Sequence, residues 1–126
     1  MEDTERFERG VEKYNEVYCG DLPAMPRGTM PFFDDMMQHL FGEIWTRPGL
    51  SQRDRRLVTM GVIAALGEGS TFAIQARSAL KNGELTAEQL REMLIHLSQY
   101  AGYPRVAGLL MPVEEVIAEF EKAAEK

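Results

Sequence analysis

Four side chains of this sequence have the chemistry and spacing to act on a small carboxylate. His96 and Tyr100 are four positions apart, so they share a face if that segment is a helix. An imidazole at that point can carry a proton near neutral pH. Arg47 and Arg53 flank the turn into a strongly apolar segment, and a guanidinium fork binds a carboxylate through two hydrogen bonds. The alternatives stay open: a hydrogen-bonded core histidine, and arginines that pair with acidic neighbours at the surface.

Other reactive groups are scarce. A single cysteine, Cys19, permits no internal disulfide, no redox thiol pair and no thiolate-rich zinc site. The two histidines do not have metal-ligand spacing, so we expect no metal ion, and we expect His39 to be structural or exposed. Trp45 has two interpretations: an apolar pocket wall whose indole N–H donates a hydrogen bond, or a core residue.

Charge is unevenly distributed along the chain. The net charge is -6, yet residues 46–82 carry six basic and two acidic groups. An acidic protein lacks the broad basic face that nucleic acid requires, whereas a local basic centre suits a small anionic ligand. The alternative is that the central cations are solvated helix residues, namely Arg47, Arg53, Arg55, Arg56, Arg77 and Lys81.

The apolar spacing is helical nearly throughout and nowhere alternates as in a strand. The chain of 126 residues is therefore predicted to be all-α, one single-domain helical bundle spanning 1–126. We expect neither a signal peptide nor a membrane span, and therefore a cytoplasmic protein. Caps, glycines and prolines predict about six helices, at approximately 5–18, 30–46, 51–66, 70–82, 86–101 and 104–124.

Several details of these helices can be tested. Thr29 is the predicted N-cap of the second helix, with an inward stripe of Phe33, Met37, Leu40 and Ile44. Residues 57–66 are apolar all round, so the third helix should be central and covered on every side. Thr86 and Gln89 have the spacing of a capping box, and Tyr100 is expected to point inward. Pro112 should kink or split the sixth helix.

Three segments, in order and at matching separations, give the chain a family resemblance. They are FGEIWTRPGLSQRDRRLVTM at 41–60, ALKNG at 79–83 and LIHLSQYAGYP at 94–104. Across roughly residues 7–118 the sequence resembles the carboxymuconolactone decarboxylase family, and its decarboxylase branch more than its peroxidase-linked branch. The resemblance implies an all-helical subunit that assembles into a ring, as a homotrimer or homohexamer. It also implies removal of CO2 from a carboxylated unsaturated lactone in aromatic compound catabolism, without metal or organic cofactor.

The sequence departs from the family pattern at two places. The segment 68–71 has no C-x-x-C pair, which excludes thiol peroxidase chemistry. The decarboxylase branch carries an acid and a histidine where Thr71 and Gln75 stand, and an amide cannot transfer a proton near neutral pH. His96 is then the remaining imidazole within the family motifs, and we expect it to be the proton donor.

We therefore expect a cofactor-free lyase acting on a small carboxylated cyclic compound. The expected catalytic residues are His96, Arg53 and Gln75, and the expected substrate-binding residues are Arg47, Trp45 and Tyr100. The expected partners are a small anionic organic ligand and further copies of the chain, with neither nucleic acid nor membrane. The alternative is a ligand-binding or scaffold homo-oligomer that has kept the fold and lost catalysis.

Overall fold

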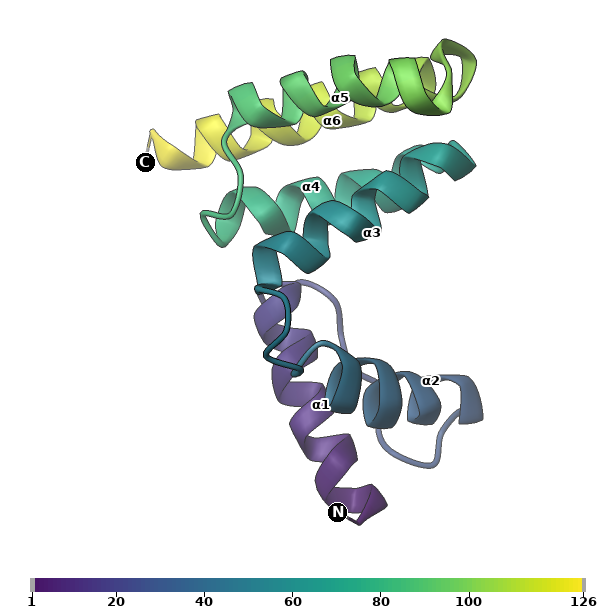
Figure 1. The fold of residues 1–126 in the computed structure, drawn as a ribbon. Helices are drawn as coiled ribbons and strands as arrows, with labels where there is room; N and C mark the ends of the chain where they lie inside the picture. Colours follow the sequence, from purple (N-terminus) through teal and green to yellow (C-terminus); the bar gives the residue numbers. More distant parts are fainter. Residues whose placement is uncertain (1, 126) are drawn as a thin grey trace. The chain divides into compact units, whose positions relative to one another are not determined.

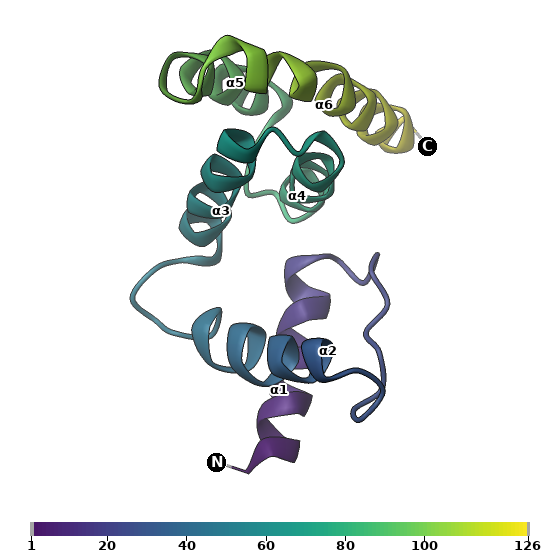
Figure 2. The same cartoon turned by 90° about the vertical axis from the view of Figure 1, so that its right-hand side faces the viewer.

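The computed structural model describes residues 2–125 and is helical, with no strand in that range, as the all-α prediction requires. Contacts between residues group the chain into two compact units (Figures 1 and 2). The first unit ends at Gln52 and the second begins at Arg53. Each unit has a hydrophobic core of its own, and the single-domain organisation stays a prediction.

The first unit pairs α1 (Asp3–Val17) with the continuous stretch formed by α2 (Pro31–Asp35) and η1 (Met36–Ile44). Phe7 and Tyr14 on α1 are buried in the core of this unit. The helix ends where Cys19 and Gly20 take positive φ angles of 58° and 72°. A glycine tolerates that backbone conformation at little cost.

The second helix of the sequence differs from its prediction in two ways. Its N-cap is Met30 rather than Thr29, because Met30 is the last extended residue before Pro31. From Met36 onward it is a π-helix, in which each N–H bonds five residues back, as Trp45 N does to Leu40 O at 2.9 Å. A π turn holds more residues than an α turn. Side chains that share one face of η1 therefore recur every four residues, rather than at alternating steps of three and four. The buried stripe is therefore Met37, Phe41 and Trp45, and Leu40 is exposed.

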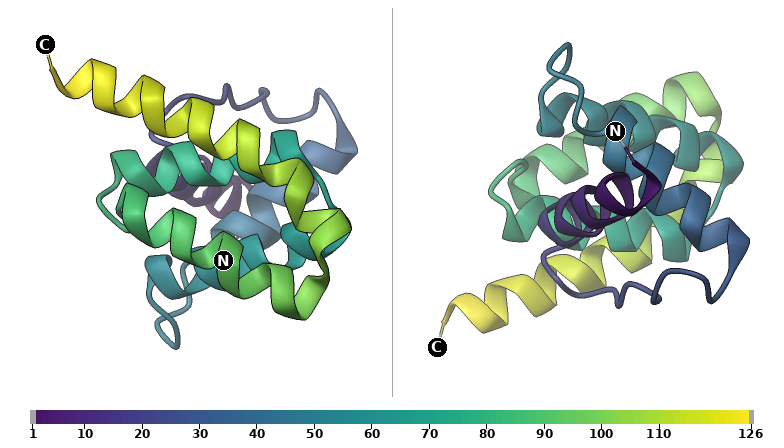
Figure 3. Two further views of the ribbon diagram at one scale, coloured as in Figure 1. Left: turned by 90° about the horizontal axis from the view of Figure 1, so that it is seen from above. Right: turned by 90° about the horizontal axis from the view of Figure 1, so that it is seen from below.

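The second unit consists of four helices in two layers, with α3 (Gln52–Leu66) and α4 (Gly69–Lys81) in one and α5 (Ala87–Ala101) and α6 (Tyr103–Ala124) in the other (Figures 1 and 2). Gly102, at φ 100°, turns the chain from α5 into α6 (Figure 3). α6 packs against both α4 and α5. The core between the layers takes side chains from all four helices, including Met60, Phe72, Leu90 and Leu109.

The predicted helix ends of this unit are largely confirmed. Thr86 Oγ1 accepts from Gln89 N (3.1 Å) and Gln89 Oε1 accepts from Thr86 N (3.0 Å), which is the predicted capping box. Asn82 caps α4 and Gly83 follows with φ 69°. Pro112 does not split α6, which runs unbroken through it.

Two further burial predictions are wrong in the described part of the second unit. The third helix is not covered on all sides: Val58, Val62 and Leu66 are 61%, 59% and 64% exposed. They follow at steps of four, so one face of α3 packs on the core while the opposite face presents an apolar ridge. Tyr100 is 83% exposed rather than inward, and it shares its face of α5 with His96, which is exposed as well.

Candidate active site

A groove of about 540 Å³ runs between α3 and α5. Its apolar lining comes from Leu57 and Gly61 on α3, Leu85 before α5, and Met93 and Leu97 on α5. Its polar lining consists of Arg53, Gln89, Glu92 and His96. A concave apolar surface with a few convergent polar groups is the usual form of a small-molecule site.

Arg53 is the cation of this groove, and two contacts orient its guanidinium. Nε donates to the main-chain oxygen of Glu84 at 2.9 Å. Nη1 lies 3.8 Å from Asp54 Oδ1, and the side chain is 45% exposed. Arg53 is thus accessible to a ligand while one edge of its guanidinium is already bound to the protein.

His96 is exposed and lines the groove, so the core-histidine interpretation is wrong. Its ring lies 5.0 Å from that of Tyr100, with 37° between the planes, as expected for two residues on one helical face. Tyr100 contacts the imidazole from outside the groove lining. The structure therefore brings Arg53 and His96 to one concavity, with Tyr100 beside the histidine.

Gln75 lies elsewhere, inside the core of the second unit. It accepts a hydrogen bond from Arg56 Nη1 at 2.8 Å. Arg56 is 0% exposed, which overturns the interpretation of this arginine as a solvated residue. Its Nε donates to Glu84 Oε1 at 2.7 Å and its Nη2 to Oε2 at 3.4 Å. Gln75 is thus part of a buried cluster with Arg56 and Glu84.

Trp45 and Arg47 belong to the first unit, whereas every residue that lines the groove belongs to the second. Trp45 is buried, and its ring stacks on that of Phe41 at 5.9 Å with 16° between the planes. Tyr14 meets Phe41 edge-on at 5.1 Å. This aromatic cluster supports the core interpretation of Trp45. Arg47 is exposed after the end of η1.

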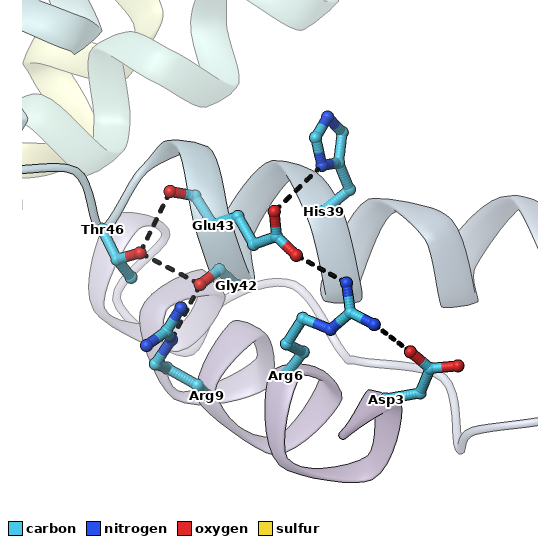
Figure 4. Close-up of polar contacts among 7 residues, drawn as sticks. All are labelled: Asp3, Arg6, Arg9, His39, Gly42, Glu43 and Thr46. Atoms are coloured by element: carbon cyan, nitrogen blue, oxygen red, sulfur yellow. Dashed lines mark hydrogen bonds and ion pairs between the residues drawn. The ribbon is translucent and has the colours of Figure 1, made fainter. Parts of the chain in front are cut away.

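The other imidazole, His39, is exposed on η1 in a chain of charged groups (Figure 4). Its Nδ1 is 3.6 Å from Glu43 Oε2, and Glu43 Oε1 accepts from Arg6 Nη1 at 2.7 Å. Arg6 also pairs with Asp3. The hydrogen bond from Arg6, more than any other cause, lowers the pKa of the Glu43 carboxyl below its ordinary value of 4.5. This chain of charges links α1 to η1.

Between residues 2 and 125 no three His, Cys, Asp or Glu side chains lie close enough together to hold a metal ion. The same part of the chain contains no helix that is both long and apolar enough to span a bilayer.

The sequence of this chain was compared with those of known protein families and of known proteins. Residues 31–115 match the pattern of the carboxymuconolactone decarboxylase family. The chain belongs to that family. A 4-carboxymuconolactone decarboxylase from Acinetobacter baylyi is 33% identical over the whole chain and 97% of its own length. The nitrosuccinic acid decarboxylase npaB of Metarhizium robertsii is 27% identical over 88% of the chain and 80% of its own length. The segment that matches the carboxymuconolactone decarboxylase family, residues 31–115, includes all of α3, α4 and α5.

Sequence reasoning missed the buried pair of Arg56 and Glu84. A signal for Arg56 exists, because it precedes Met60 and Ile63 at steps of four and three and so lies on the buried face of α3. Its charge nevertheless predicted an exposed side chain, since arginine is rarely fully buried unless it is paired. Glu84 has no such periodic signal because it lies between α4 and α5.

Proposed function

We propose that this protein is a carboxy-lyase that removes CO2 from a small carboxylated compound without a cofactor. The observation that carries the proposal is the groove in which an apolar floor meets the guanidinium of Arg53 and the imidazole of His96. Its volume of about 540 Å³ suits a small organic acid. The names of two relatives, both decarboxylases, support this class of reaction.

The two compounds in those names, 4-carboxymuconolactone and nitrosuccinic acid, each carry two carboxylates and an electron-withdrawing group. In the proposed reaction Arg53 binds the carboxylate that the product keeps. The other carboxylate lies over the apolar floor of Leu57, Met93 and Leu97, where it is desolvated. Its C–C bond breaks, CO2 leaves, and the electron pair moves onto the lactone carbonyl or the nitro group. His96, as the general acid, then delivers a proton to a carbon of the delocalised carbanion that CO2 leaves behind.

This proposal is tested by CO2 release from 4-carboxymuconolactone and from nitrosuccinic acid, using protein dialysed against a chelator. Arg53→Lys should raise KM about tenfold with little change in kcat, because an ammonium cannot replace a charged two-point contact. Arg105→Lys is the matched control, since Arg105 is exposed in the same unit and bonds to Ala65 O outside the groove. The proposal fails if wild type releases CO2 from neither compound, or if Arg53→Lys leaves KM unchanged.

A second candidate function is a binding protein without turnover. It is favoured by Gln75, an amide in the place of the family histidine that is committed to a hydrogen bond with Arg56. Such a protein would bind the dicarboxylate succinate through Arg53 and release no CO2 from either compound. Calorimetry with succinate, beside the CO2 assay, separates the two functions.

A further inference from the structure

Next to the site lies a charged pair, Arg56 and Glu84, for which the proposed function gives no role. Glu84 binds two arginines of α3 in different ways. Its carboxylate pairs with the buried Arg56, whereas its main-chain oxygen accepts from Nε of Arg53. Arg53 and Arg56 are three positions apart, so they are neighbours on the surface of α3. The same residue therefore connects a buried cation to the cation of the groove.

The chain around Glu84 is held at several points. Glu84 N and Leu85 N both donate to Ala79 O, at 2.9 and 3.3 Å. Gly83 makes the turn with positive φ, and Thr86 opens α5 with its capping box. Leu85 is buried and lines the groove directly after Glu84. A displacement of Glu84 would therefore move both an apolar lining residue and the acceptor of Arg53.

The contact with Glu84 also restricts how Arg53 can bind a carboxylate. A guanidinium offers two forked edges, one formed by Nε with Nη2 and one formed by Nη1 with Nη2. Nε is already committed to Glu84 O. A substrate carboxylate must then meet the Nη1 and Nη2 edge, where it competes with the longer contact from Asp54.

We propose that Arg56 and Glu84 are positioning residues: their buried ion pair fixes the connection between α4 and α5, whose carbonyl at residue 84 directs the Nη edge of Arg53 to the substrate. This role rests on the proposed function of Arg53 as the carboxylate site. Gln75 also holds Arg56, by accepting a hydrogen bond from its Nη1. The two buried side chains act on substrate only through Arg53, since neither lines the groove.

The first measurement needs no ligand. In ¹⁵N-edited spectra, hydrogen exchange at Nε of Arg53, assigned with Arg53→Lys, reports its bond to Glu84 O. Glu84→Gln keeps the side-chain shape and removes the charge, and Arg56→Lys keeps a charge and loses the fork. Both should accelerate this exchange several-fold while thermal unfolding shows that the variants are folded. Glu114→Gln is the matched control, because it breaks an exposed ion pair with Arg91 (2.9 Å) away from the groove.

The second measurement is a double-mutant cycle on binding of succinate, followed by calorimetry. Glu84→Gln should weaken succinate about tenfold in wild type and have almost no further effect in Arg53→Lys, because the two changes remove one interaction. Unchanged Nε exchange in folded Glu84→Gln and Arg56→Lys, or additive effects in the cycle, would overturn the positioning role. Faster exchange with unaltered succinate binding in both Arg53→Lys and Glu84→Gln would instead overturn Arg53 as the carboxylate site.

Discussion

Arg56 is a fully buried cation, so the residues around its guanidinium must accept its hydrogen bonds. It has a carboxylate partner in Glu84 and an amide acceptor in Gln75. Removing one partner of a buried ion pair costs about 3–5 kcal/mol, since the remaining charge stays desolvated. An amide at position 75 can accept from a guanidinium without adding a positive charge. The amide at position 75 and the buried arginine are thus physically linked.

Because Arg56 donates to the side chain at position 75, a histidine placed there should not act as a proton donor. In Gln75→His, alone or with Thr71→Glu, the imidazole would have to accept the hydrogen bond from Arg56 and would remain neutral. We expect no gain in kcat/KM for CO2 release from 4-carboxymuconolactone, measured by stopped assay against wild type. A gain of the order of 10²-fold, typical of a working general acid, would show that position 75 reaches the substrate.

Glu43 gives a stability prediction with a definite sign. Its pKa is lower in the folded protein than its ordinary value, chiefly through the hydrogen bond from Arg6. The carboxylate therefore stabilises the fold above pH 4.5, and this contribution is lost as the pH falls through the depressed pKa. Glu43→Gln should flatten the acid side of the stability profile, as followed by urea unfolding with Trp45 fluorescence. Equal acid sensitivity in the variant and wild type would contradict this.

At the scale of elements, sequence predicted the helices where local chemistry marks their ends and failed where it does not. The capping box of Thr86 and Gln89 and the Asn82–Gly83 pair use local hydrogen bonds and backbone preferences, which are readable from spacing. The π-helix of η1 has no such local sequence signal. Because its turn is wider than that of an α-helix, Phe41 is buried where Leu40 was predicted to be. In the candidate site, Arg53 and His96 were predicted from residue type. Arg56 was not predicted to be buried, because its residue type is usually exposed.

The crossing of α1 and η1 depends on two glycines. A Cβ on Gly10 would lie 1.7 Å from Met37 O, and one on Gly42 would lie 2.6 Å from Arg6 O. Gly10→Ala should therefore destabilise the first unit by about 3 kcal/mol, because backbone rather than a flexible side chain would have to move. Gly49→Ala, which meets open space, is the control and should change stability by less than about 0.5 kcal/mol. Urea unfolding followed by the buried Trp45 measures both, and equal midpoints would refute the argument.

For the whole molecule, the apolar ridge of Val58, Val62 and Leu66 is an exposed feature of α3 that the chain itself does not cover. We propose that copies of this chain cover it in a homotrimer or homohexamer, since exposed apolar patches of this kind mark interaction sites. Light scattering should give a multiple of 14.3 kDa, and Val62→Glu should reduce it. Ala118→Glu adds the same charge at an exposed site on α6 and should leave the mass unchanged. A wild-type mass of 14.3 kDa at micromolar concentration would contradict assembly.

In the proposed reaction, His96 in the groove supplies the proton for a cofactor-free decarboxylation. The most direct test compares the initial rates of CO2 release from 4-carboxymuconolactone and nitrosuccinic acid for wild type, His96→Gln and His39→Gln. His96→Gln should lose about 10²-fold or more of the rate on the compound that wild type turns over, while His39→Gln stays within about twofold. A wild-type rate in His96→Gln, or an equal loss in both histidine variants, would contradict the claim.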